Sequence, residues 1–255
     1  MIINNYVLLN KGIVLLEKNP VLFGISTREY GSFRASDLFF KAKLEAIKLS
    51  TETEYYSFVK AEHSTITHRV KGNSNEMFDG DAITYRSEKG FLALVHCSHI
   101  TLGKNILQES FSALPGFKNI HAVIYPGICQ NCYEVQKDVY DKFVKESYKT
   151  NFRHFCKNGI DHWLLDLRGL INTQLLELGL NNENIISFDM CSAHSSLPEV
   201  DTEILTPRTT ETSFFSYRKR KEMNRNLVFA RLTSSKRLIC ANTGDCPYVL
   251  FYNYF

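Results

Sequence analysis

The chain consists of short apolar runs that do not alternate regularly with helical stretches. Runs of a length suited to one buried strand occur at residues 55–59, 82–85, 91–95, 122–125, 185–190 and 227–232. A doubly wound parallel sheet would instead place a helix after nearly every strand. The pattern therefore predicts an α+β fold in which mixed β-sheets are flanked by helices.

Helical spacing of apolar residues appears in four places, at residues 36–49, 102–112, 135–148 and 161–178. The last of these ends before Gly179, a typical residue just beyond a helix. The N-terminal segment predicts a β-hairpin, with strands at 6–9 and 13–16. No linker rich in Pro, Gly or Ser divides the chain, so we expect a single domain over residues 1–255.

Composition excludes several classes of protein. The net charge of +3 is too small to indicate a nucleic-acid partner. No apolar run reaches the roughly 18 residues that a membrane span needs, and Lys11, Glu17 and Lys18 interrupt the N-terminal stretch. We therefore expect a cytoplasmic protein without membrane contact. Seven irregularly spaced cysteines favour reduced thiols, some of them metal ligands, over a disulfide framework.

Three possible metal ligands lie at the ends of predicted strands. His63 and His96 each follow an apolar run, and Cys246 precedes the strand predicted at 248–252. Two imidazoles and one thiolate suit Zn²⁺, and a fourth position left to water is typical of a catalytic site. The spacing matches no short zinc-binding pattern, however, so a structural role for each residue stays open.

Two blocks of the sequence are distinctive, P-G-I-C-Q-N-C-Y-E-V at residues 126–135 and F-F-S-Y-R at residues 214–218. The first resembles the P-A-I-G-P-C-C-Y-E-V block of the YfiH-type laccase-domain family, which includes purine nucleoside phosphorylases, and the second resembles that family's C-terminal F-F-S-Y-R block. Residues 26–28, S-T-R, and the D-L…N…Q-L…G pattern of residues 166–179 also resemble family elements, and Cys191 follows in family order. The resemblance implies a YfiH-like fold.

The resemblance also implies a ligand set. His63 corresponds to the family's Q-x-H histidine, His96 to that of A-H-A-G-W-R-G, and Cys246 to the cysteine of T-A-D-C. These residues are expected to hold Zn²⁺, or alternatively Cu²⁺. Asp245 is expected to shuttle a proton if the protein deaminates adenosine, although a turn-forming role is the alternative.

For substrate binding, the resemblance makes Arg28 a candidate contact for phosphate. Phe215 and Tyr217 are expected either to wall a pocket for the base or to belong to the core.

Two departures from the family pattern stand out. The T-A-D-C-like piece, residues 237–254, comes last in the chain instead of before the His96 loop. We predict that this displaced strand inserts beside residues 91–95 and delivers Cys246 to His63 and His96. In addition, residues 98–101 read S-H-I-T where the family has G-W-R-G, so an arginine suited to binding phosphate is missing.

The resemblance implies phosphorolysis of purine nucleosides by a monomer or homodimer, with nucleoside and phosphate as partners, and adenosine deamination as a related activity. Three alternatives stay open. The first is a copper-dependent polyphenol oxidase, and the second is a paralogue that binds a nucleoside or a protein without turnover. The third is thiol chemistry, by the Cys129-x-x-Cys132 pair or by Cys246 with a histidine.

Overall fold

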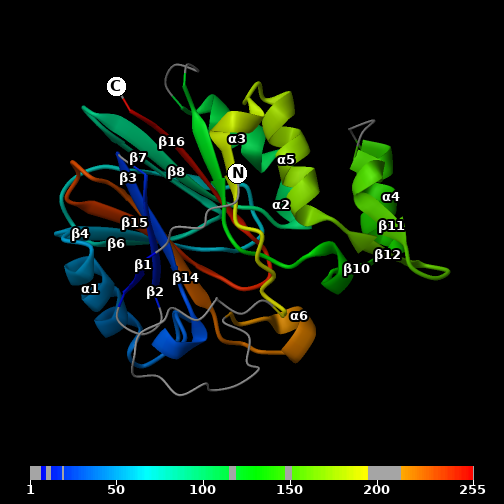
Figure 1. The fold of residues 1–255 in the computed structure, drawn as a ribbon, viewed down its shortest axis with the longest axis horizontal. Helices are drawn as coiled ribbons and strands as arrows, with labels where there is room; N and C mark the ends of the chain where they lie inside the picture. The colour runs from blue at the N-terminus through cyan, green and yellow to red at the C-terminus, as the bar shows by residue number, and fades with distance from the viewer. Residues whose placement is uncertain are drawn as a thin grey trace.

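Two large β-sheets face each other, and helices cover their outer sides (Figure 1). The computed structural model describes residues 7–9, 13–18, 20–114, 119–146, 151–194 and 214–254. Its mixed sheets and flanking helices confirm the predicted α+β class and the single domain. No described helix is both long and apolar enough to cross a bilayer.

The described strands form three sheets. In order across the first sheet they are β1 (Val7–Leu9), β2 (Ile13–Lys18), β3 (Val21–Ser26), β14 (Asn226–Leu232), β15 (Arg237–Thr243), β4 (Tyr55–Lys60) and β6 (Glu76–Asp79). The second contains β13 (Ile185–Ser187), β9 (His121–Ile124), β16 (Tyr248–Tyr254), β8 (Gly90–His96), β7 (Ala82–Ser87) and β5 (Thr67–Val70). The small third sheet contains β10 (Glu134–Gln136), β12 (His162–Leu165) and β11 (Phe155–Lys157).

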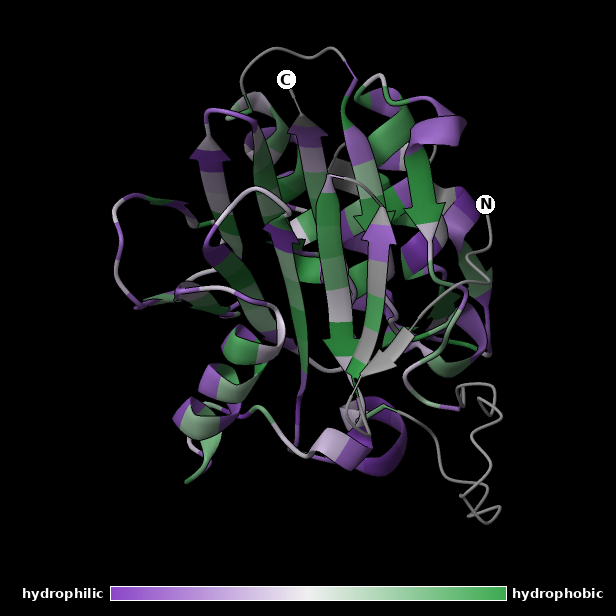
Figure 2. Cartoon of the chain, turned by 60° about the vertical axis from the view of Figure 1, so that its left-hand side comes forward, coloured by the Kyte–Doolittle hydropathy of each residue, from purple (hydrophilic) through white to green (hydrophobic). Residues whose placement is uncertain are grey.

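The central strands are apolar throughout because both of their faces are buried. In β8, Leu92 and Leu94 point into the core between the two large sheets, whereas Ala93 and Val95 join the core beneath the helices. This division follows from the alternation of side chains along a strand. Figure 2 shows the result, with hydrophobic residues concentrated along the strands and hydrophilic residues at the periphery.

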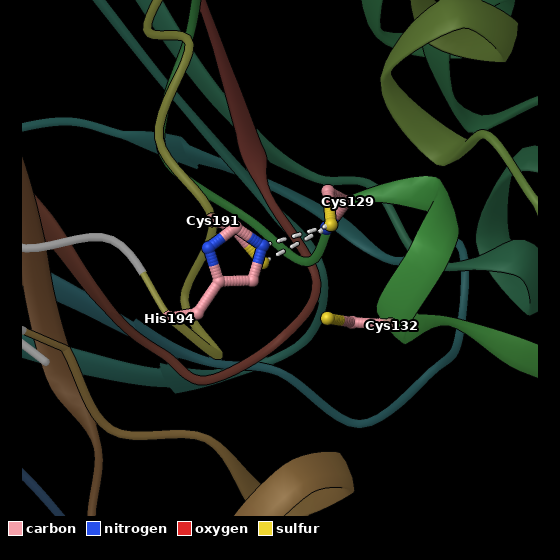
Figure 3. A group of neighbouring side chains, drawn as sticks. All are labelled: Cys129, Cys132, Cys191 and His194. Atoms are coloured by element: carbon pink, nitrogen blue, oxygen red, sulfur yellow. Dashed lines mark hydrogen bonds between the residues drawn. The ribbon is translucent and has the colours of Figure 1, made fainter.

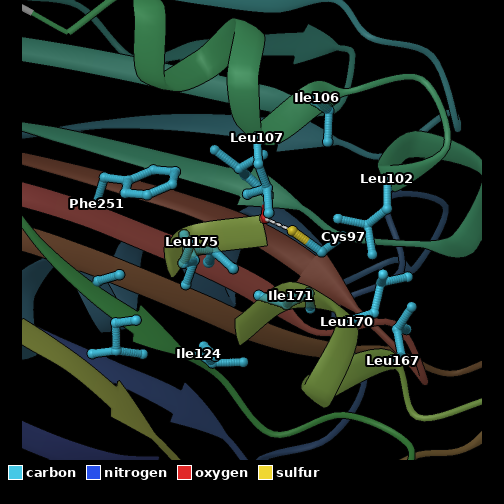
Figure 4. Packing of buried hydrophobic residues seen from close by; sticks show 14 of the residues in the cluster. Cys97, Leu102, Ile106, Leu107, Ile124, Leu167, Leu170, Ile171, Leu175 and Phe251 are labelled. Carbon is cyan, nitrogen blue, oxygen red and sulfur yellow. Dashed lines mark hydrogen bonds between the residues drawn. The ribbon is translucent and has the colours of Figure 1, made fainter. Parts of the chain in front are cut away.

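Each large sheet has its own helical cover. Helix α1 (Phe40–Ser50) packs on the seven-stranded sheet through Phe40, Leu44 and Ile47. Helices α3 (Ile106–Ser112) and α5 (Leu167–Glu177) pack on the six-stranded sheet (Figure 4). The remaining α-helices are α2 (His99–Leu102), α4 (Lys137–Glu146) and α6 (Tyr217–Arg220); short 3₁₀ helices are η1 (Arg28–Tyr30), η2 (Gln130–Cys132), η3 (Asn151–His154) and η4 (Asn182–Asn184).

The helix predicted at 161–178 is wrong in its first third. Residues 162–165 form β12, in which Trp163 and Leu165 are buried alternately with half-buried neighbours. Helix α5 begins only after Asp166, whose side chain accepts a hydrogen bond from the Gly169 N–H at 2.9 Å. Because an aspartate that caps a helix stops it from extending backwards, the polar residue divides the segment.

Two other predictions needed smaller changes. The helix predicted at 102–112 is interrupted at Asn105, which adopts a left-handed backbone with φ of 61°. The N-terminal hairpin is confirmed in the pairing of Val7 with Leu15 and of Leu9 with Ile13, although residues 10–12 lie outside the described part of the chain.

The C-terminal tail contributes one strand to each large sheet. Strand β15 pairs in parallel with β4, and β16 lies between β8 and β9, antiparallel to both. The predicted pairing of the tail with residues 91–95 is therefore present, with Tyr248 opposite His96. The turn at residues 244–247, which carries Cys246, joins the two sheets.

Candidate metal centre and pocket

His96 is held in one orientation by a buried carboxylate. It ends β8, and its Nδ1 lies 2.7 Å from Oδ1 of Asp81. Asp81 also accepts hydrogen bonds from the Ser64 N–H and hydroxyl, at 2.6 and 2.8 Å. Burial opposes ionisation of Asp81, but the hydrogen bonds from His96 and Ser64 outweigh it and lower its pKa to about 2. An imidazole bound in this way has its Nε2 free to bind a metal.

His63 lies beside His96 in a strained backbone conformation. The two ring centroids are 5.1 Å apart, and Nδ1 of His63 is 3.0 Å from the Ser98 hydroxyl. The φ of 56° is unfavourable for a residue with a side chain, and Asp81 stabilises it by accepting the His63 N–H at 3.0 Å. Burial and the neighbouring His96 lower the pKa of His63, which favours the neutral, metal-binding form.

Cys246 lines the same pocket as the two histidines. The ligand atoms of His63, Asp81 and His96 lie within 4.8 Å of one another, and the Cys246 sulfur is not a member of this group. Burial raises the pKa of the thiol to about 12, and the adjacent Asp245 acts in the same direction. The structure thus brings the three predicted ligands to one pocket and places the two imidazoles in close contact.

The pocket has a volume of about 670 Å³, within the range of small-molecule sites. Four basic side chains line it: Arg34, Lys60, Arg218 and Arg225. Lys60 is paired with carboxylates, and Arg225 donates to backbone carbonyls. Arg218 donates one guanidinium N–H to the Glu134 carbonyl at 3.4 Å. Among the described residues no carboxylate pairs with the guanidinium of Arg34 or Arg218, so their remaining N–H groups are available to an anion.

The predicted substrate residues divide between the pocket and the core. Tyr217 lines the pocket, whereas Phe215 is only 5% exposed and does not. Arg28 forms an ion pair with Glu222 and lies 5.0 Å from the Phe215 ring centre, also outside the pocket lining. Arg28 is therefore not positioned to hold an anion there, because its charge is already matched.

Asp245 reaches the pocket wall but is fully engaged. Its carboxylate accepts hydrogen bonds from the hydroxyls of Ser192 and Ser216, at 2.9 and 2.5 Å, and from the Arg218 N–H at 2.7 Å. This geometry suits the turn-forming role that the sequence left open. It fastens the start of α6, which carries Tyr217 and Arg218, to the turn that carries Cys246.

Sequence reasoning did not single out Asp81, Tyr133 or Arg218, although Tyr133 and Arg218 each lie in a block that resembles the family. The Tyr133 hydroxyl is 2.6 Å from Nδ1 of His99, and the Arg218 guanidinium lies 4.9 Å from the Tyr133 ring centre. Burial, followed by the charge of Arg218, lowers the pKa of His99 to about 4, so its imidazole is neutral at pH 7. The pocket therefore also offers a neutral hydrogen-bonding pair.

Neither Cys97 nor the Cys129-x-x-Cys132 pair is placed for thiol chemistry. Cys97 is fully buried beneath the helices, where its sulfur lies 3.6 Å from the Val95 carbonyl oxygen (Figure 4). It therefore cannot pair with His96 as a nucleophile. The Cys129-x-x-Cys132 motif lies at the 3₁₀ turn η2, whereas thioredoxin-type chemistry uses such a motif at the start of an α-helix.

Solved structures define the class of fold. The chain superposes on a hypothetical protein YfiH of Bacillus licheniformis with a TM-score of 0.69 and 14% identity, covering 98% of this chain and 99% of that one. YlmD from Geobacillus stearothermophilus gives a TM-score of 0.61 with 14% identity, covering 98% of each chain. The architecture is therefore that of the YfiH-like proteins.

Sequence comparison then gives the family. Residues 81–233 match the family described as multi-copper polyphenol oxidoreductase laccase, and the chain belongs to this family. It is also 30% identical over 144 residues to the purine nucleoside phosphorylase Cj1217c of Campylobacter jejuni. That match covers 54% of this chain and 52% of the relative, so the chain spans about half the length of this curated relative.

Proposed function

We propose that the protein is a zinc-dependent phosphorylase of purine nucleosides such as adenosine and inosine. The observation that carries the proposal is the paired imidazoles of His63 and His96 in a pocket with two available arginines. In the reaction, a phosphate oxygen bonds to C1′ of the ribose, the bond from C1′ to the base nitrogen breaks, and the released base takes up a proton. The products are free base and ribose 1-phosphate.

His63, His96 and Cys246 are the proposed zinc ligands. The two imidazoles fit this role, because Asp81 occupies Nδ1 of His96 and Ser98 contacts Nδ1 of His63, which leaves the Nε2 atom of each ring for the metal. Cys246 lines the same pocket, but its sulfur lies outside the group of ligand atoms within 4.8 Å and would have to approach the rings to bind the same ion. A bound Zn²⁺ would polarise a substrate oxygen or supply hydroxide at neutral pH. Copper is the alternative metal, since imidazole and thiolate ligands also bind it.

Arg34 and Arg218 are the proposed phosphate contacts, because a planar guanidinium pairs its N–H groups with phosphate oxygens. They would bind the phosphate in place of the family's G-W-R-G arginine, which is absent from residues 98–101. Tyr217 would form a wall beside the base, and the neutral His99–Tyr133 pair would hydrogen-bond to the nucleoside. Asp245 is assigned a positioning role, since its carboxylate fastens α6 to the Cys246 turn.

Two further observations support the proposal. The Campylobacter jejuni relative is named as a purine nucleoside phosphorylase, and its similarity covers part of this chain. The pairing of β16 with β8 supports the idea that residues 237–254 are a displaced family strand, because it brings Cys246 to the pocket of His96. Adenosine deamination remains a second reaction for the same site.

Incubation of the protein with adenosine or inosine, with and without phosphate, tests the proposal. We expect free base and ribose 1-phosphate only when phosphate is present. His96→Ala is expected to lower the turnover at least about 100-fold, because it removes a metal ligand. His162→Ala is the matched control, since that ring is 45% exposed and does not line the pocket.

Four other results of these assays would each overturn the proposal and indicate a different function. Base release without phosphate would indicate a hydrolase, and inosine formed from adenosine would indicate a deaminase. Copper-dependent oxidation of polyphenols would favour the oxidase. Nucleoside binding without any product would favour the non-catalytic paralogue, which the missing G-W-R-G arginine makes worth testing.

A further inference from the structure

A second group of possible metal ligands lies outside the pocket lining. It consists of Cys129, Cys132, Cys191 and His194 (Figure 3). The two loops that carry these residues follow β9 and β13, which are parallel neighbours in the six-stranded sheet. Because neighbouring parallel strands have their C-terminal ends at the same end of the sheet, the loops that follow them lie close together.

Backbone hydrogen bonding joins these two loops. Gly127 and Cys191 form an isolated parallel bridge, and the Ser192 N–H donates to the Gly127 carbonyl at 3.1 Å. Each loop then carries two potential ligands with the same spacing, Cys129-x-x-Cys132 on one and Cys191-x-x-His194 on the other. Pairs of ligands with two residues between them are typical of closed structural zinc sites.

The four ligand atoms are already gathered around one point. They all lie within 4.8 Å of one another, and the Cys129 sulfur is 3.3 Å from Nε2 of His194. In a tetrahedral site with Zn–S bonds of about 2.3 Å, the sulfurs are about 3.8 Å apart. A small contraction of the observed arrangement would therefore produce that geometry.

The surroundings of Cys191 suit a thiolate ligand. Its sulfur accepts backbone N–H groups from Cys129 at 3.3 Å and from Ala193 at 3.4 Å. Such donors stabilise negative charge on a sulfur. Cys191 is 4% exposed, whereas His194 is exposed, so the metal would enter from the His194 side.

We propose that Cys129, Cys132, Cys191 and His194 bind one Zn²⁺ in a closed structural site. Three sulfurs and one imidazole nitrogen fill a tetrahedral shell and leave no position for water, so the site has no catalytic role. None of the four residues belongs to the proposed pocket centre, and the inference does not depend on the reaction proposed there.

The site would rigidify two walls of the pocket. Cys132 directly precedes Tyr133, which contacts His99, and Cys191 directly precedes Ser192, which donates to Asp245. Joining both loops through one ion fixes these two contacts relative to each other. On this proposal the Cys129-x-x-Cys132 motif binds metal and does not carry out the thiol chemistry that the sequence left open.

Metal content of the intact protein tests the inference. The Cys129→Ser/Cys132→Ser variant is expected to contain one Zn²⁺ per chain less than the wild type, measured by mass spectrometry of metals together with protein concentration. Cys156→Ser is the matched control, because Cys156 is exposed and lies in neither group, and it should keep the wild-type content. His96→Ala serves as the opposite control, since any loss it causes belongs to the pocket.

Two further measurements keep the test decisive if the double variant folds poorly. Co²⁺-loaded protein is expected to show strong thiolate-to-cobalt charge-transfer absorption, which His96→Ala/Cys246→Ser retains. The exposed His194→Ala is expected to fold normally and to release its zinc to a chelator at least tenfold more readily. Unchanged zinc content in the double variant would overturn the proposal. So would a native Cys129–Cys132 disulfide, detected as a mass lower by two hydrogens, or stoichiometric copper in place of zinc.

Discussion

Tyr248 stands directly opposite His96 in the antiparallel ladder between β16 and β8. Because Cys246 precedes Tyr248 by only two residues, this pairing sets the thiol at the end of the sheet where the imidazole emerges. The pairing of strands depends on register and not on chain order. A ligand from the last part of the chain can therefore join ligands that come far earlier.

Asp81 determines how His96 is presented, so we expect Asp81→Asn to weaken metal binding in the pocket. The amide cannot replace the charge that holds the imidazole, and the partly buried N–H groups of His63 and Ser64 lose a carboxylate acceptor. The zinc affinity should fall about 10- to 100-fold, measured by competition with a chelator. The free energy of unfolding should fall by about 2–4 kcal/mol.

Asp79→Asn is the control for this variant. Asp79 lies two residues away, is 68% exposed and pairs only weakly with Lys60 at 3.4 Å. Its replacement should leave both measurements within experimental error. Equal zinc affinity in Asp81→Asn and Asp79→Asn would show that Asp81 does not orient a ligand.

Much of the fold could be predicted because the strongest local signals agree with the tertiary structure. The continuous apolar run at 91–95 is buried on both faces of β8, which is the condition that such runs indicate. The prediction failed at residues 161–165 because Leu164 and Leu167 fit helical spacing, whereas the residues buried alternately in the strand are Trp163 and Leu165. Only the cap at Asp166 decides between the two, and its effect depends on where the helix begins.

The part of the candidate site that lies in recognisable motifs could be predicted from the sequence. His63, His96 and Cys246 were found by resemblance. Which side chains pair with one another, however, depends on the tertiary structure. Nothing in the sequence indicates that Glu222 pairs with Arg28, which removes Arg28 from the pocket. The Cys191-x-x-His194 pair was overlooked because it lies about 60 residues beyond Cys129, and only the parallel pairing of β9 and β13 brings them together.

Arg218→Ala is expected to weaken phosphate binding selectively. If its guanidinium contacts the phosphate, the KM for phosphate should rise at least about tenfold, as expected for a lost charged hydrogen bond. The KM for the nucleoside should change much less. Initial rates at varied phosphate and varied inosine concentrations separate these effects.

Lys219→Ala is the matched control for Arg218→Ala. It removes the same charge from the neighbouring position, which does not line the pocket. A similar rise in the phosphate KM in both variants would indicate a general effect of charge. It would then remove Arg218 from its proposed role.

Glu222→Gln should destabilise the protein in a pH-dependent manner. Burial opposes ionisation of Glu222, but hydrogen bonds from the Ser216 N–H, Arg28 and Arg220 outweigh it and hold its pKa below the ordinary value of a glutamate. Folding therefore favours the carboxylate. The resulting stabilisation is present above about pH 4.5 and is lost as the pH falls through the folded-state pKa.

We expect the free energy of unfolding of Glu222→Gln to be about 1–2 kcal/mol below the wild type at pH 7. The difference should become smaller below pH 4, in urea denaturation at a series of pH values. Glu62→Gln, at a position 46% exposed, should show little difference at either pH. A deficit for Glu222→Gln that stays constant from pH 7 to pH 3 would contradict the assignment of the stabilisation to the ionised carboxylate.

Gly127→Ala tests how closely the Cys129 loop and the Cys246 turn must approach. A β-carbon at position 127 would lie 2.7 Å from Pro247, in a ring that cannot rotate away. Relief of that clash requires the two backbones to separate, so we expect a loss of about 1–3 kcal/mol in the free energy of unfolding and weaker metal binding. Gly244→Ala is the control, because its nearest neighbour would be 3.5 Å away. Equal urea midpoints for the two variants would show that the loop and the turn are not held in contact.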